Sequence, residues 1–124
     1  MSKSSFQLRI LYGENDTEVL ASQASLIQKA GHQVEKAVGR KAVEEALRRG
    51  VFDLVILGPT LSKDDRHHLP YMVKKATSGT RVLVLHAAGG RHPQVDASIE
   101  AGTKIEVLLA AISSLLSKEA EVSR

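Results

Sequence analysis

Three consecutive polar residues could do chemistry near the start of the chain. Glu14, Asn15 and Asp16 follow its first apolar stretch. Carboxylate oxygens are ligands for hard divalent cations, which makes Glu14 and Asp16 candidate metal ligands. The alternative is a loop that caps the following helix, because Asn and Asp are strong N-cap residues. We favour the capping interpretation, since a hard cation needs more oxygens than these residues supply, and we expect neither metal nor cofactor.

A second candidate position ends the most apolar run of the chain. Residues 54–58 are continuously apolar and precede Pro59, which predicts a strand buried on both faces of a parallel sheet. Gly58 then lies at the carboxyl end of a central strand, where ligands bind in open α/β sheets. Glycine offers no nucleophile there. His86 ends the next apolar run and is a candidate base or ligand, but the lack of a partner favours a simple polar strand end.

The elements that position these residues alternate between strands and helices. We predict strands at residues 6–12, 32–38, 54–58, 81–86 and 96–100, and helices from a cap at Asn15 or Asp16 to Gly31, at 41–49, from about 69 to Gly79, and at 103–116. Pro70 is expected to disrupt the start of the third helix. The glycine-rich segment 87–95 is expected to be a loop. This alternation predicts a parallel sheet with helical crossovers.

Length and composition predict one domain. The chain has 124 residues, a net charge of +3 and no cysteine. Residues 1–124 are expected to form a single domain, with a core at about 6–117 and a polar tail at 118–124. The absence of cysteine and of long apolar runs leads us to expect a cytoplasmic protein without a membrane contact. Basic residues are scattered and aromatic residues are 3% of the chain, so nucleic acid is not an expected partner.

The chain resembles the receiver domain of two-component response regulators. Three stretches carry the resemblance: residues 10–20 (ILYGENDTEVL), 52–58 (FDLVILG) and 105–112 (IEVLLAAI). They are similar to the family's opening strand with its acidic pair, to the strand that delivers the phospho-accepting aspartate, and to its last helix. The resemblance implies a flavodoxin-like, doubly wound α/β fold with a five-stranded parallel sheet in the order 2-1-3-4-5. Helices would cover both faces, with the fourth helix shortened or lost.

The same resemblance places the family's reactive positions on residues that cannot perform its chemistry. The phosphoacceptor falls on Gly58, the acidic pair on Glu14 and Asn15, the switch Ser/Thr on His86, and the lysine on Ala101. Phosphoryl transfer needs a nucleophile beside a bound cation and positive charge at the transferred group. The chain therefore resembles a degenerate pseudo-receiver without catalytic residues.

Three classes of function remain open at this stage. The first is a phosphorylation-independent signalling module that contacts a signalling partner or an output domain. The second is a small-ligand or nucleotide binder that uses the crevice at the strand carboxyl ends, near Gly13, Gly58 and His86. The third is an enzyme, for which the sequence shows no acid, base and nucleophile together. The emptied phosphorylation site favours the first class.

The last helix carries a wider apolar arc than one buried face requires. At 100° per residue, one arc of about 60° contains the residues expected to face the sheet, Ile105, Leu109, Ile112 and Leu116. Four further apolar residues extend that arc and form an expected interface: Val107, Leu108, Ala111 and Leu115. Exposed apolar patches mark partner sites, so we predict association through the face made by the short fifth strand and this helix, most simply as a two-fold homodimer. The alternative is a monomer whose 88–95 loop covers the patch.

Overall fold

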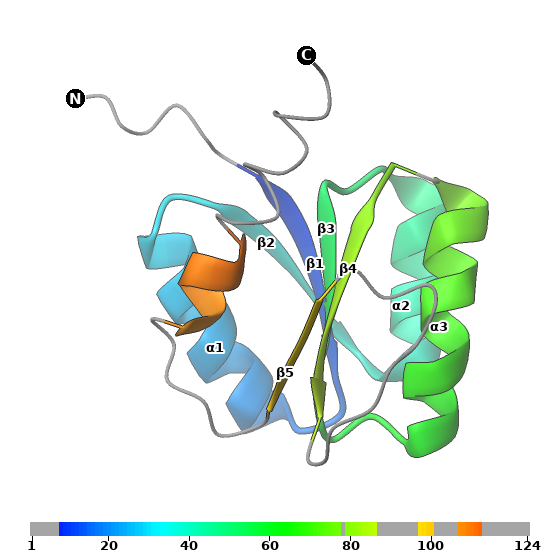
Figure 1. Ribbon diagram of the computed structural model, residues 1–124, viewed down its shortest axis with the longest axis horizontal. Helices are drawn as coiled ribbons and strands as arrows, with labels where there is room; N and C mark the ends of the chain where they lie inside the picture. The colour runs from blue at the N-terminus through cyan, green and yellow to red at the C-terminus, as the bar shows by residue number, and fades with distance from the viewer. Residues whose placement is uncertain (1–7, 78, 87–96, 101–106, 113–124) are drawn as a thin grey trace.

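The computed structural model describes residues 8–77, 79–86, 97–100 and 107–112, and strands and helices alternate along them (Figure 1). The elements are β1 (Arg9–Glu14), α1 (Thr17–Lys29), β2 (Gln33–Val38), α2 (Gly39–Arg49), β3 (Leu54–Leu57), α3 (Lys63–Ala76), β4 (Arg81–His86) and β5 (Ala97–Glu100). Residues 107–112 are also helical. No helix among these residues is long and apolar enough to cross a bilayer.

All strand pairs in the sheet are parallel. Strands β1 to β4 lie in the order β2-β1-β3-β4, as predicted, and β5 pairs with β4 at the edge. Gly13 of β1 pairs with Leu57 of β3, so these two strands end side by side. The parallel arrangement places both carboxyl ends, and the loops that follow them, at one edge of the sheet.

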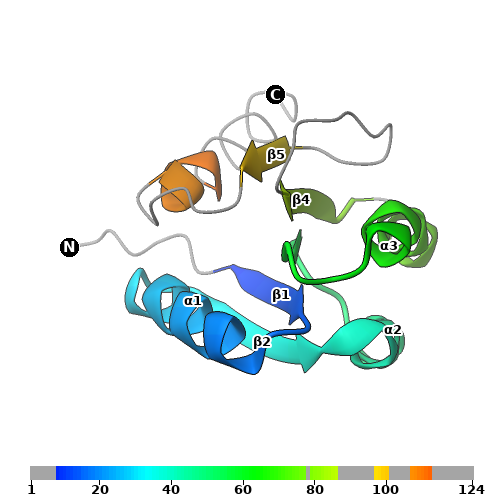
Figure 2. The same cartoon turned by 90° about the horizontal axis from the view of Figure 1, so that it is seen from below.

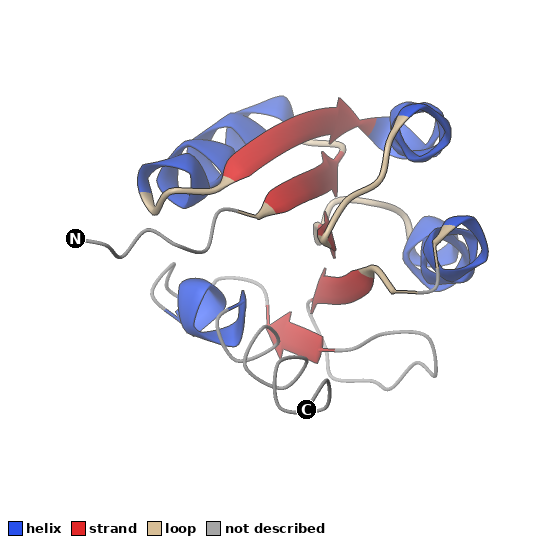
Figure 3. Ribbon diagram, turned by 90° about the horizontal axis from the view of Figure 1, so that it is seen from above, coloured by secondary structure: helices blue, strands red, loops and turns tan. Residues whose placement is uncertain are grey.

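Helices cover both faces of the sheet. Helix α1 and the helical residues 107–112 lie on one face, and α2 and α3 lie on the other (Figures 2 and 3). Every residue of β3 is buried, as expected for a central strand that is covered on both sides. The fold therefore has three layers with a hydrophobic core on each side of the sheet.

Helix α1 begins and ends as its sequence predicts. Asp16 is the N-cap, and its Oδ1 accepts hydrogen bonds from the backbone N–H groups of Glu18 at 3.0 Å and Val19 at 3.2 Å. Gly31 follows the C-cap with φ of 107°, a left-handed conformation that suits glycine. The capping interpretation of Asp16 is therefore confirmed.

Helix α3 is longer than the sequence suggested. We expected a firm helix only from Leu69 because of Pro70, but α3 begins at Lys63 and contains the proline. Ser62 caps it, with its Oγ accepting from the N–H of Asp65 at 3.0 Å. Pro70 lacks a backbone N–H, so α3 loses one hydrogen bond. The capped first turn and the burial of Leu69 and Pro70 stabilise the helix by more than this loss.

Strand β1 extends beyond its predicted end at residue 12. Gly13 and Glu14 both belong to the strand, and both are buried. A Cβ atom on Gly13 would lie 2.6 Å from the Cγ2 atom of buried Val43 in α2. Gly13 is therefore a close-packing position that lets α2 approach the sheet, rather than a strand breaker.

The helical residues 107–112 are rotated relative to our prediction. Leu108 is 3% exposed and belongs to the core with Ile112, while Leu109 is only partly buried. The assignment of Leu108 to an interface is therefore wrong, because its side chain packs against the sheet. Val107 is 49% exposed, as predicted for the outer face. The predicted loss of the fourth helix, and Leu115, lie outside the described residues.

Candidate functional site

The candidate site lies where β1 and β3 end, and its central side chain is Glu14. This residue ends β1 and is fully buried, with 0% exposure. Its Oε1 accepts hydrogen bonds from the backbone N–H of Thr60 at 2.9 Å and of Asn15 at 3.2 Å, and from the Thr60 hydroxyl. Its Oε2 is buried and has no hydrogen-bond partner among the described residues. One oxygen is thus well satisfied, while the other faces the space beside β3.

Gly58 faces this second oxygen directly after β3. Its N–H donates to the carbonyl oxygen of Gly13 at 2.8 Å, which continues the pairing of the two strands. A Cβ on Gly58 would lie 2.8 Å from Oε1 of Glu14, and closer still to its Cδ and Oε2. The Glu14 carboxylate therefore occupies the space that any side chain at position 58 would need.

Thr60 ties the loop after β1 to the loop after β3. Its Oγ1 accepts from the backbone N–H of Asn15 at 3.0 Å and of Asp16 at 2.9 Å. Its carbonyl oxygen accepts from Nδ2 of Asn15 at 2.9 Å. Asn15 thus uses its amide to hold the two loops together. These bonds hold together the two loops whose backbone N–H groups, at Asn15 and Thr60, donate to the Glu14 carboxylate.

Tyr12 lies two residues before Glu14, on the same face of β1, and is fully buried. Burial raises the pKa of its phenol above the ordinary value, and the negative charge of Glu14 raises that pKa further. The phenol is therefore neutral at physiological pH. Among the described residues, no lysine or arginine forms an ion pair with Glu14.

Glu14 and Asp16 contact different parts of the structure. Asp16 is exposed and caps α1, whereas Glu14 is buried against Thr60. The part of the chain that the structure describes contains no group of three or more His, Asp or Glu side chains that could hold a metal.

The other predicted positions are more dispersed. His86 is the last residue of β4 and pairs in register with Glu100, while Ala101 lies outside the described residues. Asp53 lies at the amino end of β3, where its Oδ2 accepts from the N–H of Arg9 at 2.9 Å. It is therefore at the end of the strand opposite to Gly58.

Sequence reasoning missed Thr60, the residue that organises the site. A hydroxyl shortly after the Gly58-Pro59 turn gives no periodic signal of its own. The available clue was topological: loops that follow neighbouring parallel strands meet at one edge of the sheet. Polar residues after the first strand should therefore have been matched with polar residues after the third.

No family model and no curated protein matches this sequence. Solved structures do match. A CheY-like response regulator receiver domain from Methanospirillum hungatei JF-1 superimposes with a TM-score of 0.82 at 19% identity, covering 94% of this chain and 98% of that one. A two-component response regulator from Clostridium difficile gives a TM-score of 0.81 at 16% identity, covering 91% and 98%.

A third similar structure is a signal receiver domain of a histidine kinase from Syntrophus aciditrophicus. It gives a TM-score of 0.77 at 20% identity, covering 90% of this chain and 91% of that one. These likenesses span most of each chain, and their low sequence identity means that they show the fold. The chain therefore has the flavodoxin-like α/β fold of CheY-like receiver domains.

Proposed function

We propose that this chain is a receiver-like module of a two-component-type signalling system that acts through protein contacts without being phosphorylated or catalysing a reaction. The receiver fold supports the signalling class. The observation that carries the proposal is the pairing of Gly58 with Glu14: the residue at the end of β3 has no side chain, and a buried carboxylate fills the adjoining space.

Glu14 is a poor substitute for an accessible phosphoacceptor. A nucleophilic carboxylate must reach the phosphorus atom of its donor and must lie beside positive charge that stabilises the transition state. Glu14 is fully buried, and its Oε1 is held by Thr60 and Asn15. In this arrangement the carboxylate maintains one loop conformation rather than reacting.

Incubation with acetyl phosphate and Mg²⁺ tests this proposal. We expect the intact mass to remain that of the unmodified chain, because position 58 offers no oxygen. A receiver domain that carries an aspartate at the corresponding position serves as the control and should gain one phosphoryl group. A stoichiometric, base-labile adduct on this chain would contradict the proposal, and its loss in Glu14→Gln would identify Glu14 as the acceptor.

We further propose that the exposed side of the 107–112 helix takes part in association, most simply as a homodimer. Val107 is exposed and Ala111 is partly buried, so both remain candidates after the removal of Leu108 from the interface. Val107→Glu with Ala111→Lys should leave the fold intact and shift the mass in light scattering towards the monomer. A wild-type protein that is already monomeric at high micromolar concentration would rule out the homodimer.

A ligand-binding role for the crevice near Gly13, Gly58 and His86 has less support. Glu14 fills the space beside Gly58, and a Cβ at Gly13 would already meet the Val43 side chain. The space directly beside these two glycines is thus taken by the protein's own side chains, which leaves less room for a ligand there.

A further inference from the structure

Helices α2 and α3 lie side by side on one face of the sheet (Figure 2). A cavity of about 690 Å³ lies between their outer surfaces. The residues that line it recur three or four positions apart on each helix, so each helix contributes one continuous stripe. The cavity is therefore an elongated groove between two helices. Its Arg40 end begins at the carboxyl edge of the sheet, where α2 follows β2, and the groove extends from there along both helices.

The floor of this groove is apolar. Leu47 of α2 and Met72 of α3 are partly buried against the core below. Tyr71 of α3 stands at the groove with 42% of its surface exposed, and its ring contacts His67 edge to face with centroids 5.8 Å apart. A Leu, a Met and a Tyr in one open groove provide the adaptable apolar surface that is typical of partner sites.

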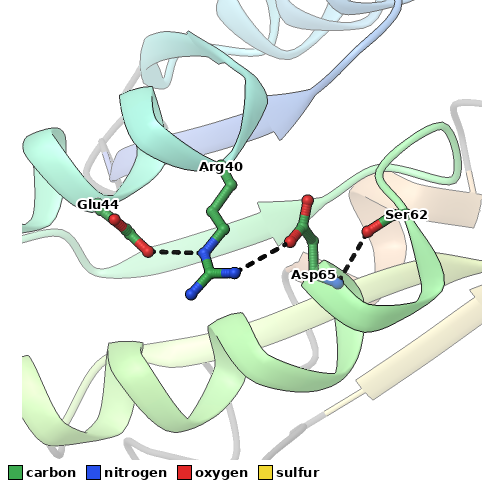
Figure 4. Close-up of polar contacts among 4 residues, drawn as sticks. All are labelled: Arg40, Glu44, Ser62 and Asp65. Atoms are coloured by element: carbon green, nitrogen blue, oxygen red, sulfur yellow. Dashed lines mark hydrogen bonds and ion pairs between the residues drawn. The ribbon is translucent and has the colours of Figure 1, made fainter.

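The rim of the groove is positively charged. Arg48 of α2 and Lys75 of α3 are both exposed, and neither forms an ion pair among the described residues. Arg40 lies at the end of the groove nearest the start of both helices. Figure 4 shows it between Glu44, with Nε to Oε2 at 2.8 Å, and Asp65 of α3, with Nη1 to Oδ1 at 3.6 Å.

The Arg40 contacts join the two helices while leaving the rest of the rim cationic. The hydrogen bond to Glu44 raises the pKa of Arg40, so this side chain stays charged. Ser62, whose Oγ accepts from the N–H of Asp65, positions the α3 end of the bridge (Figure 4). Charge at Arg48 and Lys75 remains available to an incoming group.

We propose that the α2–α3 groove binds an amphipathic helix of a protein partner whose apolar stripe is flanked by carboxylates. Apolar side chains of such a helix would cover Leu47, Tyr71 and Met72, and its acidic residues would meet Arg48 and Lys75. The proposal rests on the proposed function in that the module works through protein contacts. A nucleic acid fits less well, because it needs dense cationic charge and several stacking aromatics rather than an apolar floor.

Selection from a display library of random 18-residue peptides tests this proposal on the full chain. We expect enriched peptides that combine Leu or Phe at helical spacing with Asp or Glu. A synthetic copy of one such peptide should bind saturably in fluorescence anisotropy and should shift the backbone amides of Leu47, Met72 and Lys75. Binding should weaken as salt is raised, because exposed charges are screened.

Charge reversal at the rim supplies the decisive comparison. Arg48→Glu with Lys75→Glu should weaken peptide binding by on the order of tenfold. Lys29→Glu with Lys36→Glu makes the same change in net charge at exposed positions outside the groove, and it should leave binding within about twofold of wild type. If the reversed rim variant does not fold, Arg48→Gln with Lys75→Gln replaces it.

Several outcomes would overturn the groove proposal. These are the absence of any enriched peptide, enrichment without acidic residues, unchanged binding to the folded rim variant, and groove binding by a 20-base-pair DNA duplex instead of peptide. Peptides that shift only the amides around Val107 would overturn the groove while preserving the proposed function. A phosphoryl adduct in the acetyl phosphate experiment would instead contradict the proposed function and leave the peptide result unaffected.

Discussion

Gly58→Asp should lower the free energy of unfolding by about 3 kcal/mol, or prevent folding altogether, because the new side chain enters the space of the Glu14 carboxylate. Its Cβ alone would lie 2.8 Å from Oε1 of Glu14. A second carboxylate would also add like charge at a buried position, since both residues are buried. Urea unfolding followed by circular dichroism measures the effect. Restoring the aspartate therefore should not by itself create a working phosphorylation site.

Gly79→Asp is the matched control for this substitution. Gly79 is exposed, and a Cβ there would meet nothing within 4 Å. The same change should alter stability by less than about 0.5 kcal/mol at this position. Equal stability of the two variants would show that Glu14 does not occupy the space beside Gly58.

A double-mutant cycle that combines Gly58→Asp with Glu14→Ala should show strong coupling between the two positions. Glu14→Ala alone is destabilising, because it leaves the backbone N–H of Thr60 without its acceptor and removes one of the two acceptors of the Asn15 N–H. In the double variant the aspartate introduced at position 58 has room. The loss of unfolding free energy in the double variant should therefore be about 2 kcal/mol smaller than the sum of the losses in the two single variants. Additive costs would contradict direct contact between the side chains.

Leu108→Ala should lower the free energy of unfolding by about 3 kcal/mol, whereas Val107→Ala should change it by less than about 0.5 kcal/mol. The two residues are neighbours, but Leu108 is 3% exposed and Val107 is 49% exposed. Truncation of Leu108 leaves a cavity in the core that it shares with Ile112. Urea denaturation midpoints at equal protein concentration provide the measurement.

The reverse order of effects would contradict the observed burial of these two side chains. In that case Val107 would be packed and Leu108 would be free to meet a partner. The comparison is internally controlled, because both variants remove apolar side chains from adjacent positions of one helix.

The fold was predictable because local and periodic signals agree along most of the chain. The uninterrupted apolar run of β3 indicated burial on both faces, and β3 is buried throughout. Asp16 and Gly31 marked the ends of α1 through local chemistry, one by capping N–H groups and the other by adopting positive φ. Strand β4 was predicted with its observed bounds because its central residues also form an uninterrupted apolar run.

The remaining features depend on contacts between segments that are distant in sequence. The first strand was predicted to end at residue 12, but it continues through Gly13, whose lack of a side chain serves the packing of Val43. Glu14 was interpreted as part of a helix-capping loop, but it ends β1 and is held by Thr60, 46 positions along the chain. Pro70 stays inside α3 because burial against the core outweighs its local preference. None of these partners can be identified from spacing along a single element.

The most direct test of the closed, phosphorylation-independent site is a titration of the ¹⁵N-labelled protein with Mg²⁺ and beryllofluoride. Beryllofluoride mimics a phosphoryl group and does not hydrolyse, so it reports an acceptor whose phosphorylated form would be short-lived. We predict that the backbone amides of Glu14, Gly58 and Thr60 keep their chemical shifts up to millimolar concentrations of both ligands. Saturable shifts at these three amides that disappear in Glu14→Gln would contradict the account.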